Sequence, residues 1–435
     1  MIGTYLTDPI FGDNELKERF SDASMTRAML EVEAALAMAQ AGLGVVPEEE
    51  AKDIAETAAQ LDIDPRALAE GVRSSGVPVP ALVAALKKAV GQPASDYVHF
   101  GLTSQDVVDT ATVLCLRGAL DDLAARLASL IDALAEQSDA HDETVMLART
   151  RGQLATPTTA GLRIAQWAQP LIEFENELVS VEASALRVQV GGASGNRTAL
   201  GAQSAAVSAA MAHALGLADA PPWHTNRAGF HRLAGWLNRV VSACGKIGAD
   251  IALSSRGEVA EMRAGGGGGS STMPHKSNPV TAEALEALNL AAQAYYTGFT
   301  ASAAQREERD GAAWSVEWLF LPQLVMATGA ALKNANRLAE SLQVNADVAA
   351  RRISDTPAVM TEAAVFALAQ EIGRSRAVEE VKLAMAEGGA LGEALRARGF
   401  TGIDWEAVLD PAPAVSASRD VARQIFDLRA KKKGP

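Results

Sequence analysis

The residues best suited to chemistry follow a run of five glycines at positions 265–269. The next ten residues, 270–279, read Ser-Ser-Thr-Met-Pro-His-Lys-Ser-Asn-Pro. Glycines leave the backbone unrestricted, which predicts a mobile loop, and Pro279 is typical of the first position of a helix. The hydroxyls of Ser270 and Ser271, the Lys276 ammonium and a helix N-terminus together favour an anionic ligand. A Gly/Ser linker between two helices is the alternative.

A second polar stretch, Thr103-Ser104-Gln105-Asp106, precedes a long segment with a regular apolar stripe. Thr, Ser and Asp are common helix-capping residues, so capping by itself would account for three of these positions. The hydroxyls, the Gln105 amide and the free N–H groups of a helix start are also suited to hold a carboxylate. Capping is the simpler explanation when the stretch is considered by itself.

Arginines supply further candidates. Arg149-Thr150-Arg151 lies shortly before Pro157, where we expect a helix to begin, and Arg309 follows Glu307 in a charged cluster. An arginine matches a carboxylate through paired N–H donors. Solvated surface charge is the alternative in both places.

Long helices must position these residues. Leucines spaced by three and four residues mark a helix over about 107–139, and this period of about 3.5 is that of a helix-bundle seam. Similar stripes predict helices around 164–178, with a kink at Pro170, around 233–251, and from about 319 to 342. Long helices with narrow apolar stripes pack as a bundle, and we expect part of the seam to be buried between subunits.

The bulk properties restrict the class of partner. The chain has 435 residues, 48% of them hydrophobic, and a net charge of −14. This charge argues against nucleic acid or an anionic membrane as the main partner, and no apolar run reaches the length of a membrane-spanning helix. Cys115 and Cys244 lie in apolar stripes and are expected to be buried thiols. Six scattered histidines show no metal-ligand spacing. We expect a cytoplasmic protein without metal or cofactor.

The stretch that ends in Met-Pro-His-Lys-Ser-Asn-Pro resembles the signature of the fumarase/aspartase superfamily. The stretch Thr103–Asp106 resembles its first motif, and the stretch around Arg149 resembles its second. The resemblance implies an all-α, three-domain fold with a central long-helix bundle. We expect an N-terminal domain over 1–105, the bundle over 106–346 with the signature loop at 264–279, and a small helical domain over 347–435.

Several stretches resemble the cycloisomerase branch of that superfamily, whose members act on 3-carboxy-cis,cis-muconate. They are the Thr-Ser-Gln-Asp form of the first motif, Gln189-Val-Gly-Gly, Trp223-His224 and Trp314-x-x-Glu317-Trp318. Arg151 stands where fumarate-releasing lyases typically have His. Asn226, Ala228 and Glu307 also depart from the usual motifs. The expected activity is therefore cycloisomerisation. A lyase such as adenylosuccinate lyase is the alternative, and a non-catalytic helical assembly protein is a third interpretation.

The resemblance also implies a set of site residues and an assembly. Ser270 would transfer the proton and Lys276 would act with it. The substrate, a small polycarboxylate, would be bound by Thr103, Ser104, Gln105, Arg149, Thr150, Arg151, Gln189, Ser271, Asn278 and Arg309. In this superfamily three subunits of a homotetramer build each site, so we expect shared sites here.

Overall fold

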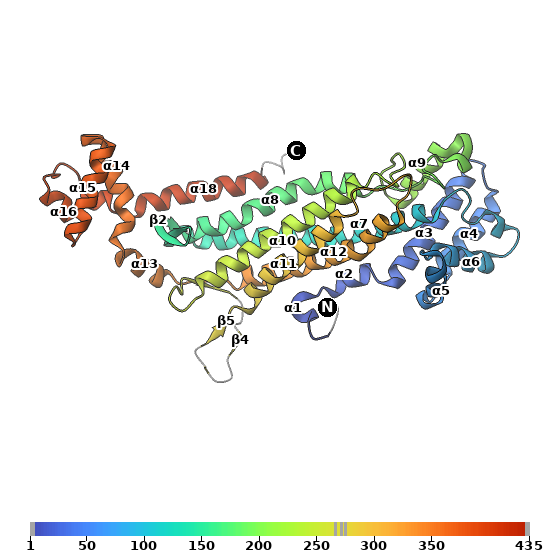
Figure 1. Ribbon diagram of the computed structural model, residues 1–435, viewed down its shortest axis with the longest axis horizontal. Helices are drawn as coiled ribbons and strands as arrows, with labels where there is room; N and C mark the ends of the chain where they lie inside the picture. Colours follow the sequence, from blue (N-terminus) through green and yellow to red (C-terminus); the bar gives the residue numbers. More distant parts are fainter. Residues whose placement is uncertain (1–4, 265–267, 270–272, 274–275, 431–435) are drawn as a thin grey trace. The chain divides into compact units, whose positions relative to one another are not determined.

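The computed structural model describes residues 5–264, 268–269, 273 and 276–430, and its elements are nearly all helices (Figure 1). Five helices are long: α7 (Ser104–Ala140), α8 (Ala160–Ala185), α10 (Ala228–Ser254), α11 (Val280–Thr300) and α12 (Gly311–Glu340). The predicted long helices are confirmed, although α12 begins eight residues before the expected position 319. Pro170 lies inside α8, and α11 begins directly after Pro279.

The remaining helices are shorter than these five. The first part of the chain forms α1 (Asp8–Phe11), α2 (Asn14–Arg19), α3 (Asp22–Ala41), α4 (Glu48–Gln60), α5 (Pro65–Ser75), α6 (Val79–Val90) and the 3-10 turn η1 (Ala94–Tyr97). Between α8 and α10 lie η2 (Thr198–Gln203) and α9 (Ser204–Leu215). The last part forms α13 (Ala346–Ser354), η3 (Pro357–Met360), α14 (Thr361–Ile372), α15 (Arg374–Glu387), α16 (Leu391–Ala397), α17 (Trp405–Val408) and α18 (Ala412–Ala430).

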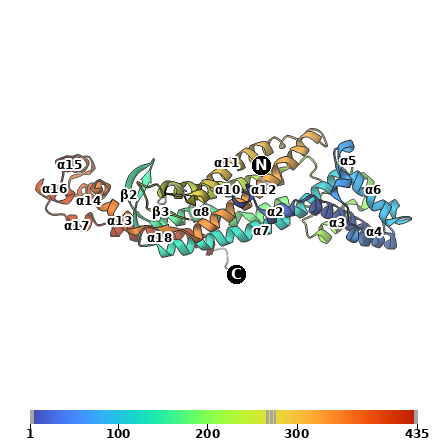
Figure 2. The ribbon, with the colours of Figure 1, turned by 90° about the horizontal axis from the view of Figure 1, so that it is seen from below.

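The long helices run side by side in the ribbon (Figure 2), and hydrogen bonds join several of them. The Trp314 indole N–H on α12 donates to Asp109 Oδ1 on α7 at 2.9 Å. The Ser242 hydroxyl on α10 donates to Asn289 Oδ1 on α11 at 3.0 Å. Arg239 on α10 donates to Glu177 on α8 at 2.8 Å. The expectation that these helices pack together is therefore confirmed.

The chain divides into two compact units, and each long helix contributes residues to both. Unit 1 contains Met1–Leu127, Glu177–Cys244 and Ala287–Lys333, and unit 2 contains Ala128–Asn176, Gly245–Glu286 and Asn334–Pro435. Unit 1 has a hydrophobic core built mainly from α3, α4, α6, the start of α7 and α9. Unit 2 contains a separate core around Trp405, formed by α14 to α17. The three-domain division stays a prediction.

A β-hairpin stands where we expected a helix to begin. β1 (Val145–Thr150) pairs antiparallel with β2 (Gln153–Thr159), and Pro157 lies opposite Leu147. The expectation of a helix at Pro157 is therefore wrong. A two-stranded ribbon tolerates proline because both of its strands are edges. Helix α8 begins only at Ala160, where the Thr159 hydroxyl accepts the Leu162 N–H at 3.1 Å.

Four further strands of two residues each form two antiparallel pairs: β3 (Met262–Arg263) with β6 (Gln343–Val344), and β4 (Gly268–Gly269) with β5 (Ser277–Asn278). Cys115 and Cys244 are both buried free thiols, as predicted. Within the described residues, α12 is by length and composition the one helix apolar enough to cross a membrane, but 56% of its apolar window is buried in the protein.

Candidate active site

The first motif is organised by the buried carboxylate of Asp106 on α7. Asp106 accepts the backbone N–H groups of Gly191 and Gly192, each at 2.8 Å, and that of Thr103 at 3.0 Å. His224 Nε2 lies 2.7 Å from the same carboxylate. Two segments distant in sequence, at Gly191-Gly192 and at His224, are thus fixed to the start of α7 by one side chain.

Capping does not occupy the hydroxyls of this motif. Asp106, and not Thr103 or Ser104, supplies the side chain that bonds the backbone at the start of α7. Neither hydroxyl has a hydrogen-bond partner within the part of the chain that the structure describes. The two groups are therefore available to a ligand, as the functional interpretation of the motif requires.

Gln105 and Arg309, both predicted site residues, are in direct contact. Arg309 Nε donates to Gln105 Oε1 at 2.9 Å, and a second Arg309 nitrogen donates to the Ala193 carbonyl at 3.1 Å. The Gln105 amide in turn donates to the His224 carbonyl at 3.0 Å. No carboxylate of the described residues pairs with Arg309, which is exposed. Its positive charge is therefore available to an anion.

Gln189 lies inside the protein. Its Oε1 accepts the Trp223 N–H at 2.9 Å, and its amide nitrogen lies 3.5 Å from Asp109 Oδ2. Both ends of the side chain are thus used by neighbouring residues. The structure gives Gln189 a supporting place behind the first motif, and a direct contact with substrate stays a prediction.

A buried ionic network lies beside Gln189, and the sequence did not reveal it. Arg227 bonds Asp109 at 2.7 Å and Glu317 at 2.9 Å. Its guanidinium also lies over the Trp223 and Phe230 rings, at 4.6 and 4.9 Å from their centroids. Burial raises the pKa of Glu317, and Arg227 opposes that effect. The motifs that contain Trp223 and Trp314 pointed to this region in the sequence. Nothing in the sequence linked Asp109 to Arg227.

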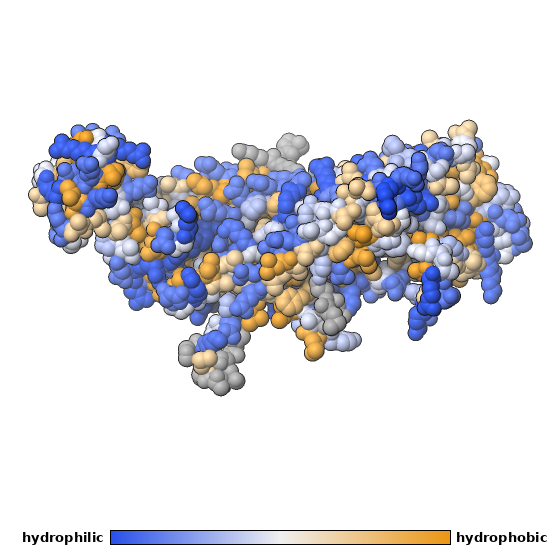
Figure 3. All heavy atoms as spheres, viewed as in Figure 1, coloured by the Kyte–Doolittle hydropathy of each residue, from blue (hydrophilic) through white to orange (hydrophobic). Residues whose placement is uncertain are grey.

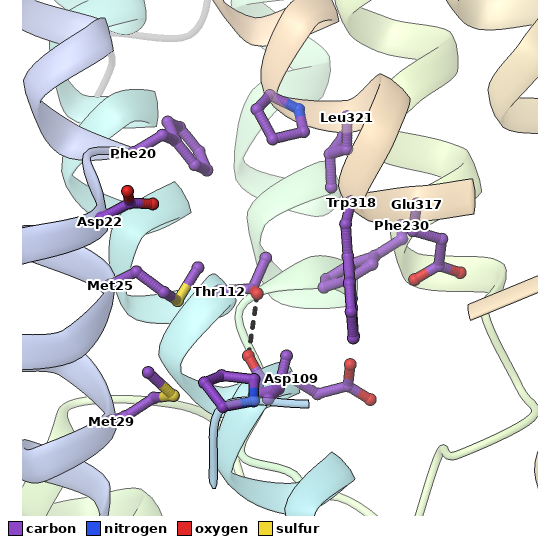
Figure 4. Close-up of a pocket in the computed structure, with 13 residues that line it drawn as sticks. Phe20, Asp22, Met25, Met29, Asp109, Thr112, Phe230, Glu317, Trp318 and Leu321 are labelled. Carbon is purple, nitrogen blue, oxygen red and sulfur yellow. Dashed lines mark hydrogen bonds between the residues drawn. The ribbon is translucent and has the colours of Figure 1, made fainter. Parts of the chain in front are cut away.

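Next to this network is a cavity of about 280 Å³ (Figure 4). Its walls are mostly apolar and include Met25 and Met29 on α3, Phe230 on α10 and Trp318 on α12. Its charged residues are all acidic, and they are Asp22, Asp109 and Glu317. An apolar space with carboxylates in its wall disfavours a polycarboxylate ligand because the charges repel.

Unit 2 holds the second motif on the β-hairpin. Both terminal nitrogens of Arg149 donate to the fully buried Glu261 at 2.7 Å. Arg352 makes a further ion pair with Glu261 at 3.0 Å. Thr150 is the last residue of β1, and Arg151 adopts a positive φ of 53° in the turn that follows. Arg149 is therefore engaged within the chain, whereas Arg151 is exposed.

The described residues of the signature loop also belong to unit 2. Lys276 is exposed, and Asn278 is in β5. Lys276 lines a cavity of about 710 Å³ together with Arg263 and the residues around the start of α13. Ser270 and Ser271 lie outside the described residues. Across the chain as described, no group of three or more His, Cys, Asp or Glu side chains is arranged to hold a metal ion.

Comparisons with known proteins agree with this fold and these motifs. A protein-family model described as "Lyase" matches residues 7–294. The chain is 38% identical to a 3-carboxy-cis,cis-muconate cycloisomerase of Pseudomonas aeruginosa, over 95% of this chain and 94% of that protein. It is 33% identical to a nitrosuccinate lyase of Streptomyces davaonensis, over 96% and 93% of the two chains.

A solved structure gives the same result. The crystal structure of 3-carboxy-cis,cis-muconate lactonizing enzyme from Pseudomonas putida matches with a TM-score of 0.90 and 33% sequence identity, over 99% of this chain and 100% of that one. The all-α fold and the motifs define an enzyme class that acts on anionic substrates. The chain belongs to the lyase family, and the predicted membership of the fumarase/aspartase superfamily is confirmed.

Proposed function

We propose that this protein is a cycloisomerase that converts 3-carboxy-cis,cis-muconate into a carboxymuconolactone. The observation that carries the proposal is its similarity, along nearly the whole chain, to enzymes named for that activity. The same similarity favours cycloisomerisation over the alternative of adenylosuccinate lyase. Such an enzyme would act in the protocatechuate branch of the β-ketoadipate pathway.

The reaction is an isomerisation in which the substrate supplies its own nucleophile. One carboxylate adds to the conjugated double bond and forms the C–O bond of the lactone. The neighbouring carbon becomes the α-carbon of an aci-carboxylate, which then accepts one proton. That intermediate carries extra charge on its oxygens, so it is stabilised by fixed cations and hydrogen-bond donors. These steps proceed by positioning and proton transfer, without a cofactor.

The described residues support roles for several predicted groups. No described carboxylate neutralises Arg309, so its guanidinium would bind one substrate carboxylate. Gln105, whose Oε1 accepts the Arg309 Nε–H at 2.9 Å, would orient the guanidinium. The unpartnered hydroxyls of Thr103 and Ser104 would donate to the same carboxylate. Lys276 and Asn278 would stabilise the aci-carboxylate, and Ser270 would deliver the proton, as the resemblance implies.

We further propose a cytoplasmic homotetramer whose subunits share each site. Large apolar side chains are exposed on four long helices, and they are Val179, Leu253, Leu290 and Leu319. In Figure 3 apolar residues interrupt the polar surface over α11 and α12. Burial of such residues between subunits removes apolar surface from water. Two buried free thiols are in keeping with a reducing compartment.

A substrate comparison tests the proposed activity. Purified protein is mixed with 3-carboxy-cis,cis-muconate, without added metal or nucleotide, and the ultraviolet absorbance of the diene is followed. We expect rapid loss of absorbance and no fumarate from adenylosuccinate or argininosuccinate. Fumarate release from either compound, with the muconate unchanged, would instead establish the lyase alternative.

A further inference from the structure

A cationic cavity lies in unit 2, between the β-hairpin and helices α8 and α10. It has a volume of about 500 Å³, which is in the range of small-molecule sites. Four cationic side chains line it, from β1, α8, α10 and the segment after α10, and they are Arg149, Arg163, Lys246 and Arg256. Asp250 is the one acidic residue in its wall.

Three of these four cations have a carboxylate partner. Arg149 pairs with Glu261 at 2.7 Å and Lys246 with Asp250 at 2.6 Å. Arg256 lies 3.5 Å from Glu258. Asp250 Oδ2 also accepts the indole N–H of Trp167 at 2.7 Å.

Arg163 differs from the other three cations. Its only hydrogen bond to a described residue is from one terminal nitrogen to the Leu147 carbonyl, at 3.0 Å. The side chain is half-buried, and burial lowers the pKa of the guanidinium. The carboxylates of Glu261 and Asp250 attract this charge, but neither makes a direct ion pair with Arg163. The guanidinium donors of Arg163 that do not bond Leu147 are therefore open to an anion in the cavity.

We propose that this cavity binds a small oxyanion, with Arg163 as its principal ligand. Carboxylate and phosphate share the required chemistry, because each presents two acceptor oxygens to a guanidinium. Lys246 adds a second positive charge, and Thr158, Gln166 and Ser254 supply polar groups in the same wall.

Of the predicted site residues that the structure describes, Arg149 alone lines this cavity, and it is already paired with Glu261. Thr150, Arg151, Lys276 and Asn278 do not line it. Arg149 and Thr150 are neighbours on β1, and successive side chains of a strand point to opposite faces. The oxyanion would thus bind behind the second motif, on the side away from Thr150. The inference does not depend on which substrate the enzyme converts.

Calorimetric titration of the full-length protein with inorganic phosphate, and separately with succinate, tests the proposal. We expect Arg163→Gln to abolish one binding event per chain. Gln166→Glu places a carboxylate in the cavity from an exposed position on α8, so it should weaken the same event by about tenfold or more. Gln370→Glu makes the matched change at an exposed position on α14 and should bind as the wild type does.

The two probes separate the sources of the anion. Binding of both, or of one alone, supports the site and identifies which oxyanion it prefers. The absence of binding for both probes overturns the proposal, and so does binding that Gln166→Glu leaves unchanged. Because Gln166 is exposed, this variant remains a valid test even if Arg163→Gln does not fold.

Discussion

Arg309 is positioned by neutral groups, the Gln105 amide oxygen and the Ala193 carbonyl. Its charge is therefore left for the substrate. Arg309→Lys keeps the charge but removes the paired donors that match a carboxylate. We expect kcat/KM to fall by about 100-fold, as for loss of a charge-assisted pair, with an unchanged Tm.

The matched control is Arg306→Lys, three residues away, where the guanidinium already pairs with Asp310. Steady-state kinetics with the proposed substrate should show less than about a twofold change, because Arg306 is exposed and Arg306→Lys keeps the positive charge beside Asp310. Equal effects of the two substitutions would contradict the role given to Arg309.

His99 contacts the buried carboxylate of Glu33 at 2.6 Å. Burial opposes the charge on His99, but the hydrogen bond and the charge of Glu33 outweigh it, so the pKa of His99 is raised. The stabilisation is therefore complete below the unfolded pKa of about 6.5 and is lost as pH rises through the higher folded pKa.

Urea unfolding from pH 5.5 to pH 9, for the wild type and His99→Gln, measures this contribution. We expect the difference in free energy of unfolding to be about 1.5 kcal/mol at the acid end and to shrink with rising pH. A difference that grows with pH would mean that Glu33 does not hold a proton on His99.

The sequence could identify those site residues that lie in recognisable motifs. Gln105 and Arg309 belong to motifs, and the structure brings them into contact. The ionic network of Asp109, Arg227 and Glu317 could not be predicted in the same way. Its partners are separated by 118 and 90 positions, so only the packing of α7 and α12 against the segment before α10 shows that they meet.

At the scale of elements, the glycine stretch after Gln189 is held very close to its neighbours. A Cβ on Gly191 would lie 2.5 Å from the His224 ring, and the Gly191 N–H bonds Asp106. Gly191→Ala must therefore displace His224 or the loop. We expect about 2 kcal/mol of destabilisation and a fall in kcat/KM.

Thermal unfolding and steady-state kinetics measure the two effects. Gly311→Ala is the control, because a Cβ there meets nothing within 4 Å. It should leave Tm unchanged or slightly higher. If Gly191→Ala behaves like this control, neither the stability nor the activity of the protein depends on the close packing of the loop on His224.

The hairpin shows why one element could not be predicted. Pro157 is compatible with the first turn of a helix and with an edge strand. The choice depends on β1, which pairs with β2 along its length, and on Thr159, which caps α8 instead. The long helices were easier to predict because their apolar period repeats over many turns.

At the scale of the whole molecule, the proposed tetramer depends on exposed leucines. Leu290 on α11 and Leu319 on α12 are 68% and 65% exposed in the single chain. A carboxylate at a buried subunit interface is unfavourable. We therefore expect the double variant Leu290→Glu/Leu319→Glu to dissociate and lose activity together.

Light scattering coupled to size-exclusion chromatography gives the mass of each variant. Leu383→Glu on α15 makes the same change at a position that is 50% exposed but lies outside the long helices, so it should remain a tetramer. A monomeric wild-type protein with full activity would refute shared sites.

The most direct test of the account is the fate of 3-carboxy-cis,cis-muconate in deuterated water with a chelator present. The product is identified by nuclear magnetic resonance, for the wild type and for Ser270→Ala. We predict a carboxymuconolactone with one deuterium on the carbon next to the new C–O bond, formed rapidly by the wild type and far more slowly by Ser270→Ala. Unchanged muconate in the presence of folded wild-type protein would contradict the proposed function, and equal rates for the two proteins would exclude Ser270 as the proton donor.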